Sequence, residues 1–318
     1  MDLIYTNSQR VDQGILTAYA FDLSFGAAEN DFEMILGANQ PTLDVGAVAY
    51  IEGTEYGGIV DGIKVSTNSE TITYTGRTWH GILNSKVIEP DTGEDHLVVS
   101  GDANELLSML IERLGLSGLF VAAEKLSGVN IPGYQFHRYC KGYDGIRDML
   151  GDNGAKLKIE WVNRSIVLSA VPISDYTRSP IDGDIATLTV EKSGNKVNHL
   201  ICLGKGELAD REVIHLYLDQ FGRVSENQYF TGLEEYSVTY ENTNSEDLAK
   251  DGEAKFKELQ SSDKAEIDIN ETAGISFDIG DIVGATEYRS GVSVAATVTQ
   301  KIVKIKNGVV STEYKTGG

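Results

Sequence analysis

The sequence contains few of the residues that support metal binding, disulfide scaffolds or nucleophilic catalysis. Its 318 residues include two cysteines, Cys140 and Cys202, far apart in the chain, and five histidines. No two histidines have metal-ligand spacing, and Cys-x-x-Cys, His-Glu-x-x-His, Gly-x-Ser-x-Gly and phosphate-loop motifs are absent. Cys202 follows Leu200 and Ile201, a context typical of a small buried residue. We therefore expect no metal, no cofactor and no catalytic residue.

Long apolar runs and basic clusters are also absent. No stretch approaches the length needed to span a bilayer, and the N-terminus lacks the basic and apolar regions of a secretory signal. The formal net charge is −21, and each third of the chain is negative. Without a basic cluster, sequence-independent binding to nucleic-acid phosphates is disfavoured. We expect synthesis in the cytoplasm and no membrane insertion.

Proline is scarce, at 5 residues, whereas glycine is abundant, at 34, which favours tight β-turns. We predict a mainly β fold with three parts: a β-module over 1–91, a mixed α+β insert over 92–185 and a second β-module over 186–318. Within the insert we expect a helix capped at Asp102 or Gly101 and ended by Gly115, a helix over 143–150, and a hairpin turning at Asn163-Arg164. A polar helix is expected near 246–260.

One pattern occurs twice, once near each end of the chain. Each copy reads apolar-Asp-apolar-Gly, a turn containing Glu-Tyr, a strand rich in Val, Ile and Lys, and a last strand ending in Thr-Gly. The first copy comprises residues 43–48, 55–58, 59–65 and 71–76, and the second comprises 277–283, 287–291, 297–305 and 313–317. Val- and Ile-rich strands resemble one another by chance. The pattern is thus either a duplicated module or two generic β-meanders.

The block 75–90 reads Thr-Gly-Arg-Thr-Trp-His-Gly-Ile-Leu-Asn-Ser-Lys-Val-Ile-Glu-Pro. It resembles a stretch of the tail baseplate hub proteins of siphophages, contractile-tailed phages, their prophages and phage-tail-like bacteriocins. Segments 30–33, 230–236, 280–283 and 299–302 are similar to the same family, so the resemblance extends over nearly the whole length. It depends on the order of these segments, since none of them is a catalytic signature.

The resemblance implies a non-enzymatic structural protein of the virion tail baseplate. It implies two tail-tube-like β-barrel domains, at 1–91 and 186–318, flanking the insert. Such hubs form homotrimers whose six barrels match a hexameric tail tube protein, and they contact a tail tip or spike protein and other baseplate proteins. DNA would pass through the ring without specific binding, and an acidic lumen would repel its phosphates.

Five residues are candidates for subunit or tube contacts: Trp79, Gly46, Gly280, Tyr56 and Tyr288. Trp79 near a domain boundary fits either core packing or an interface anchor. The strand edges of both modules are the stronger physical candidates for assembly. The alternative function is a tail-associated hydrolase of cell walls or polysaccharides, with acids among residues 89–95 as its candidates.

Overall fold

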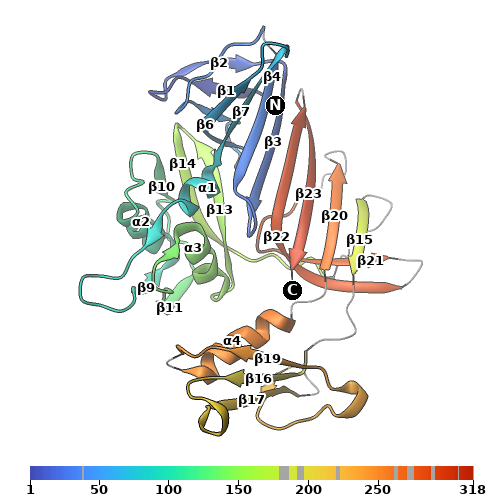
Figure 1. Cartoon of the computed structure of the whole chain (residues 1–318). Coiled ribbons are helices and arrows are strands. Elements are labelled where there is room, and N and C mark those ends of the chain that lie inside the picture. The colour runs from blue at the N-terminus through green and yellow to red at the C-terminus, as the bar shows by residue number, and fades with distance from the viewer. Residues whose placement is uncertain are drawn as a thin grey trace.

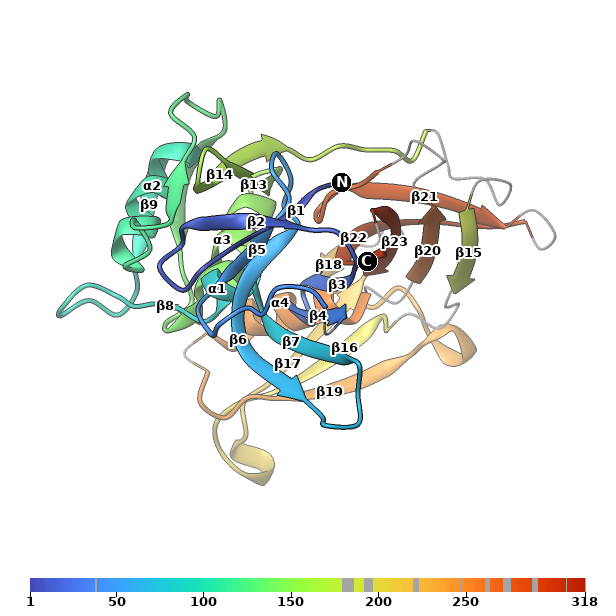
Figure 2. The same ribbon diagram turned by 90° about the horizontal axis from the view of Figure 1, so that it is seen from above.

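A computed structural model describes residues 1–37, 39–178, 186–191, 197–219, 223–245, 247–260, 264–270, 276–287, 291–306 and 308–317. Strands dominate, and most of them join one twelve-stranded sheet that contains both ends of the chain (Figure 1). The sheet order is β15-β20-β23-β22-β3-β4-β7-β6-β5-β1-β2, with β21 paired to β22. Figure 2 shows the strands from β6 to β15 as a curved band, with these two at opposite ends.

The first module supplies β1 (Leu3–Thr6), β2 (Asp12–Leu16), β3 (Tyr19–Gly26), β4 (Asp31–Gly37), β5 (Val48–Tyr50), β6 (Gly57–Val65) and β7 (Thr71–Thr78). The second supplies β15 (Ala186–Glu191), β20 (Lys264–Asn270), β21 (Ile282–Glu287), β22 (Val292–Lys306) and β23 (Val309–Gly317). The mainly β class is confirmed. The described ladders do not close into two barrels, because the second half of β22 pairs with β3 of the first module and joins the modules into one sheet.

The repeat seen in the sequence is a repeat of strand order. In the first module the order is β3-β4-β7-β6-β5, and in the second it is β15-β20-β23-β22-β21, with every neighbouring pair antiparallel. Both copies have a bulge at the same place, between Val60 and Gly62 in one and between Val298 and Gln300 in the other. Chance resemblance of β-strands does not account for a shared order and a shared bulge.

The hydrogen bonds of the two turns also correspond. The Gly46 amide donates to the Val60 carbonyl at 2.8 Å, and the Gly280 amide donates to the Val298 carbonyl at 2.8 Å. Both glycines have positive φ, 88° and 98°, a conformation that a side chain disfavours. The apolar-Asp-apolar-Gly pattern therefore encodes one turn, used twice.

A buried tyrosine anchors each turn to the last strand of its module. The Tyr74 hydroxyl accepts a hydrogen bond from the Leu43 amide at 3.2 Å, and the Tyr314 hydroxyl accepts one from the Phe277 amide at 3.1 Å. This equivalence corrects the sequence alignment by one residue. Gly76 corresponds to Thr316 rather than to Gly317, because the tyrosine and not the Thr-Gly pair holds the fixed position.

The insert packs its helices against small sheets on one side of the first module (Figure 1). The short helix α1 (Trp79–Asn84) and strand β8 (Val87–Ile88) lead from the first module into the insert. The insert's own elements are β9 (Val98–Asp102), α2 (Ala103–Arg113), β10 (Phe120–Ala122), β11 (Asn130–Gln135), β12 (Cys140–Lys141), α3 (Gly142–Gly151), β13 (Ala155–Val162) and β14 (Ser165–Pro172). The predicted cap at Asp102, the helix over 143–150 and the turn at Asn163-Arg164 are all found.

A further unit lies within the range that the sequence analysis gave to the second module. It comprises β16 (His199–Leu203), β17 (Val213–Leu218), β18 (Val224–Ser225), β19 (Ser237–Glu241), two short 3-10 turns (Leu208–Asp210 and Gly232–Glu234) and α4 (Leu248–Gln260). The helix α4 covers this separate sheet and buries Phe256 with Leu216 and Cys202. The predicted helix near 246–260 thus packs on the sheet of β16 to β19 rather than on the second module, because its apolar side chains pack against those of β16 and β17.

Candidate functional site at the junction between the modules

The two modules meet along β22 and β3, where the polar side chain of Gln300 is buried. Its amide nitrogen donates to the Ser24 hydroxyl at 2.7 Å and to the Glu29 carbonyl at 3.0 Å, and its oxygen accepts from the Ala28 amide at 2.9 Å. Gly26 lies opposite Gln300 with a φ of 139°, and a Cβ there would stand 2.2 Å from a backbone oxygen. The hydrogen bonds of Gln300 and the lack of space for a side chain at Gly26 therefore fix how β22 and β3 fit together.

A buried ion pair crosses the same junction. The Lys301 ammonium of the second module lies 2.6 Å from the Glu55 carboxylate of the first, with the two side chains 5% and 19% exposed. Tyr56, Tyr314 and Phe25 place their rings within 6 Å of the ammonium. Burial opposes the charge on Lys301, but Glu55 and the two tyrosines outweigh it and raise the pKa of the lysine. Burial raises the pKa of Glu55, and Lys301 acts in the opposite direction.

His80 completes this cluster as a neutral side chain. Its ring stacks on Phe25 with centroids 4.7 Å apart, and its Nε2 lies 3.7 Å from Glu55. Burial, and after it the nearby Lys301 charge, lowers the pKa of His80 to about 3. Its Nδ1 is buried without a hydrogen-bond partner. A neutral imidazole beside an ion pair is a packing element of the junction.

A second buried lysine joins the insert to the second module. The Lys156 ammonium on β13 lies 2.7 Å from both Asp278 and Asp281. Asp281, which is 1% exposed, also accepts hydrogen bonds from the Ser174 and Asp278 amides at 2.9 Å. Burial opposes the charge on Lys156, but hydrogen bonds to both aspartates outweigh it and raise its pKa. Asp281 lies 125 positions from its lysine partner, so no local sequence pattern indicates this pair.

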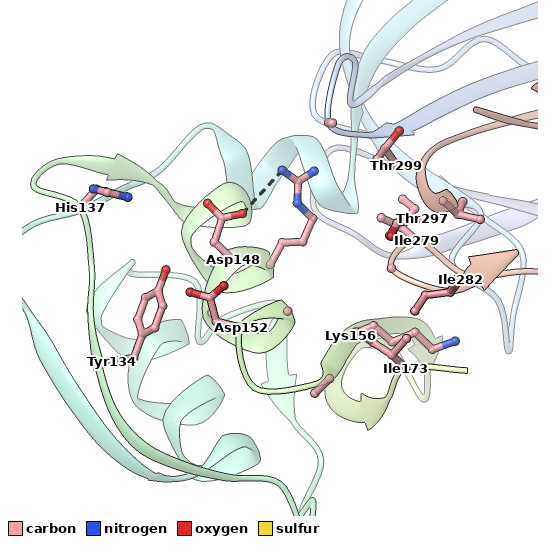
Figure 3. Close-up of a pocket in the computed structure, with 16 residues that line it drawn as sticks. Tyr134, His137, Asp148, Asp152, Lys156, Ile173, Ile279, Ile282, Thr297 and Thr299 are labelled. Carbon is pink, nitrogen blue, oxygen red and sulfur yellow. Dashed lines mark ion pairs between the residues drawn. The ribbon is translucent and has the colours of Figure 1, made fainter. Parts of the chain in front are cut away.

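A cavity of about 540 Å³ opens between the insert and the second module (Figure 3). Asp148 and Asp152 face it from α3 and its end, and Ile279 and Thr299 line the opposite wall. Arg147 lies 3.8 Å from Asp148. The wall is thus a mixture of apolar groups, carboxylates and an arginine already engaged by one of them.

The five predicted contact residues occupy different environments. Trp79 is fully buried and stacks on Trp161 of the insert at 5.2 Å, so it packs the first module onto the insert. Gly46 and Gly280 hold equivalent turns, and Tyr56 lies half-buried beside Lys301. Tyr288 lies outside the described residues. Of the four that the structure describes, Tyr56 alone belongs to the ion-pair cluster at the junction.

The acids proposed for hydrolysis lie at the surface. Glu89, Asp91, Glu94 and Asp95 are exposed, and Asp91 pairs with Arg113 at 2.8 Å. The cavity beside Glu89 is lined by none of the other three carboxylates. Their arrangement is that of a solvated turn.

Two histidines that are 16 residues apart, too far for a sequence motif, form a pair in the structure. The register of β16 and β17 brings His199 Nε2 to 2.8 Å from His215 Nδ1, while His199 Nδ1 lies 2.7 Å from Glu235. Among the described residues no group of His, Cys, Asp and Glu is arranged to hold a metal ion. None of the helices in the described chain is long and apolar enough to cross a membrane.

Known structures share this fold over nearly their whole length. A 43 kDa tail protein of prophage MuSo2 from Shewanella oneidensis matches 99% of the chain with 97% of its own, at a TM-score of 0.61 and 12% identity. A tail protein from Neisseria meningitidis matches at 0.56 and 13% identity, covering 100% of this chain and 96% of that one. The prophage tail protein gp18 of Listeria monocytogenes matches at 0.55 and 13%, covering 99% and 94%.

The chain has the fold of phage tail proteins. This likeness confirms the family fold suggested by the segments around residues 75–90. No protein-family model and no curated protein sequence matches the chain. The likeness is therefore one of three-dimensional structure, at sequence identities of 12–13%.

Proposed function

We propose that the protein is a structural component of a phage tail baseplate, a hub in which three copies form a ring of six similar modules. The observation that carries this proposal is the duplicated module with its shared strand order, bulge and tyrosine-anchored turn. A closed ring of three such chains offers near-sixfold symmetry to a tail tube and threefold symmetry to a tip or spike. The fold shared with tail proteins supports the same reading.

The ion pairs of the junction suit a part whose modules keep a fixed arrangement. Glu55 with Lys301, and Lys156 with Asp278 and Asp281, tie first module, second module and insert together at buried positions. Breaking such a pair leaves an uncompensated buried charge, which penalises any rotation of one module against another. These ion pairs support a structural role, because they fix the positions of the two modules and the insert.

The solvent face of the sheet is the candidate lining of the channel. Asp22 and Glu33 are exposed there as cross-strand neighbours, and the exposed Lys304 lies opposite Asp22. With both signs present, repulsion of DNA would be weaker than the net charge of the chain implies. DNA would pass without tight binding, because no cluster of basic groups faces it in this part of the sheet.

The test is the mass of the assembled protein. Native mass spectrometry of the purified chain is expected to show a species three times the 34.6 kDa chain mass. If the chain stays monomeric and releases sugars or muropeptides from cell walls, the hub function is wrong and the hydrolase function is favoured.

A further inference from the structure

One strand edge of the first module is open where its counterpart in the second module is covered. The second half of β22, from Gln300 to Lys306, pairs with β23 on one side and with β3 on the other. The corresponding half of β6, from Gly62 to Val65, pairs with β7 on one side, and no described strand pairs with its other edge. Since the two modules have the same strand order, β6 lacks the neighbour that β22 has.

The side chains on this half of β6 show the same difference. Ile63 lies opposite Tyr74 as Lys301 lies opposite Tyr314, so Val65 corresponds to Val303. Val303 is 0% exposed in the core, whereas Val65 is 69% exposed. Ile63 is 45% exposed, and Lys301 is 4% exposed. Positions that are buried on β22, where β3 pairs with its edge, are thus exposed and apolar on β6, where the edge is open.

The strand equivalent to β3 is open at its other edge too. β15 pairs with β20 as β3 pairs with β4, and among the described strands it has no second partner. The registers place Val190 at the position of Leu23, because Val190 pairs with Ala265 as Leu23 pairs with Phe32. Leu23 in turn lies opposite Val303. Each chain therefore offers one half of the same junction at β6 and the other half at β15.

We propose that β6 of one copy pairs with β15 of the next, antiparallel, in the register that β22 and β3 use within the chain. This register places Val65 opposite Val190 of the next copy, as Val303 is opposite Leu23. It also places Lys64 opposite Glu191, a pair of opposite charges, which stabilises cross-strand neighbours. The inference rests on the ring proposed above and assigns its subunit contact.

The dimensions of the resulting sheet fit an open channel. Each chain contributes the eight strands from β15 to β6. With three copies and a strand spacing of about 4.8 Å, the sheet has a circumference of about 115 Å, or a diameter of about 37 Å before any strand tilt. Barrels of fewer strands already enclose aqueous channels. The contact also pairs the free edges of β6 and β15, and open strand edges of this kind favour aggregation.

A disulfide tests the register directly. Facing residues of antiparallel strands have Cα atoms about 4.5–5.5 Å apart, within the range that a disulfide spans. The full-length V65C/V190C variant is oxidised and run on a non-reducing denaturing gel, beside each single variant and K64C/V190C. The last is the matched control, since position 64 faces the other side of the sheet.

The expected result is covalent dimers and trimers from V65C/V190C and single chains from all the controls. K64E is expected to lower the trimer fraction at least tenfold in native mass spectra, and K64E/E191K to restore it. A trimer that forms without the Val65–Val190 link would overturn this contact while leaving the hub proposal in place. Monomers without any link, at every concentration, would overturn both.

Discussion

Removing the Lys301 ammonium is expected to destabilise the chain more than any ordinary surface change. The side chain is 5% exposed and its partner Glu55 is 19% exposed, so K301M leaves a largely buried carboxylate without a counter-charge. Breaking a buried pair from one side costs about 3–5 kcal/mol of unfolding free energy. The loss should appear in urea denaturation followed by tryptophan fluorescence, because both tryptophans, Trp79 and Trp161, are buried in the adjoining core.

A double-mutant cycle isolates the pair from the lost packing of the lysine stem. E55Q removes the carboxylate charge with little change of shape, so K301M/E55Q should recover much of the stability lost in K301M. We expect a coupling energy of at least about 1.5 kcal/mol. A K301M loss below about 1 kcal/mol, or a coupling energy near zero, would show that the junction does not depend on this pair.

The pH dependence of the K301M variant gives a second check. Without Lys301, burial of Glu55 is uncompensated, so its pKa in the folded state rises further above the unfolded value. A raised carboxyl pKa contributes stability at low pH that is lost as pH rises through the folded value. The K301M penalty should therefore be smaller at pH 5 than at pH 8. An equal penalty at both values would contradict a buried Glu55.

Three further predictions concern the same junction and the repeat. Y74F and Y314F each leave a buried amide unpaired and should each cost about 1–3 kcal/mol in urea denaturation, whereas a large cost in one alone would contradict equivalent turns. Because the pKa of His80 is lowered in the folded state, the unfolded state alone takes up the proton between pH 7 and pH 5. The wild type should therefore lose about 2 kcal/mol more unfolding free energy than H80F over this range. Equal losses in the two proteins would contradict a neutral His80. G26A should lower the thermal midpoint by several degrees, because its Cβ meets the Thr299 carbonyl at 2.2 Å; an unchanged midpoint would show that the junction can shift.

Local features were predictable from the sequence because their signals lie within a few residues. The Asp102 cap, the helix over 143–150 and the turn at Asn163-Arg164 each depend on neighbouring residues alone. The doubled pattern was visible for the same reason. Its alignment was wrong by one residue, since the hydrogen bond from the Phe277 amide to the Tyr314 hydroxyl is a tertiary contact that no spacing reveals.

The junction itself could not be read from the sequence. Glu55 and Lys301 are separated by 246 positions and Lys156 and Asp281 by 125, so only the folded sheet brings them together. The separate unit under α4 was also missed, because no change of composition marks its borders. Trp79 was placed among the contact candidates since a large ring near a boundary fits a core and an interface equally well, and burial against Trp161 is a property of the fold.

Electron cryomicroscopy of the assembled protein would show the arrangement of the modules directly. We expect a ring of six similar modules around an open channel, two from each of three chains. Contacts of β22 with β3 inside a chain would alternate around it with contacts of β6 with β15 between chains. A particle in which the two modules of one chain do not occupy neighbouring, equivalent places around a common axis would contradict it.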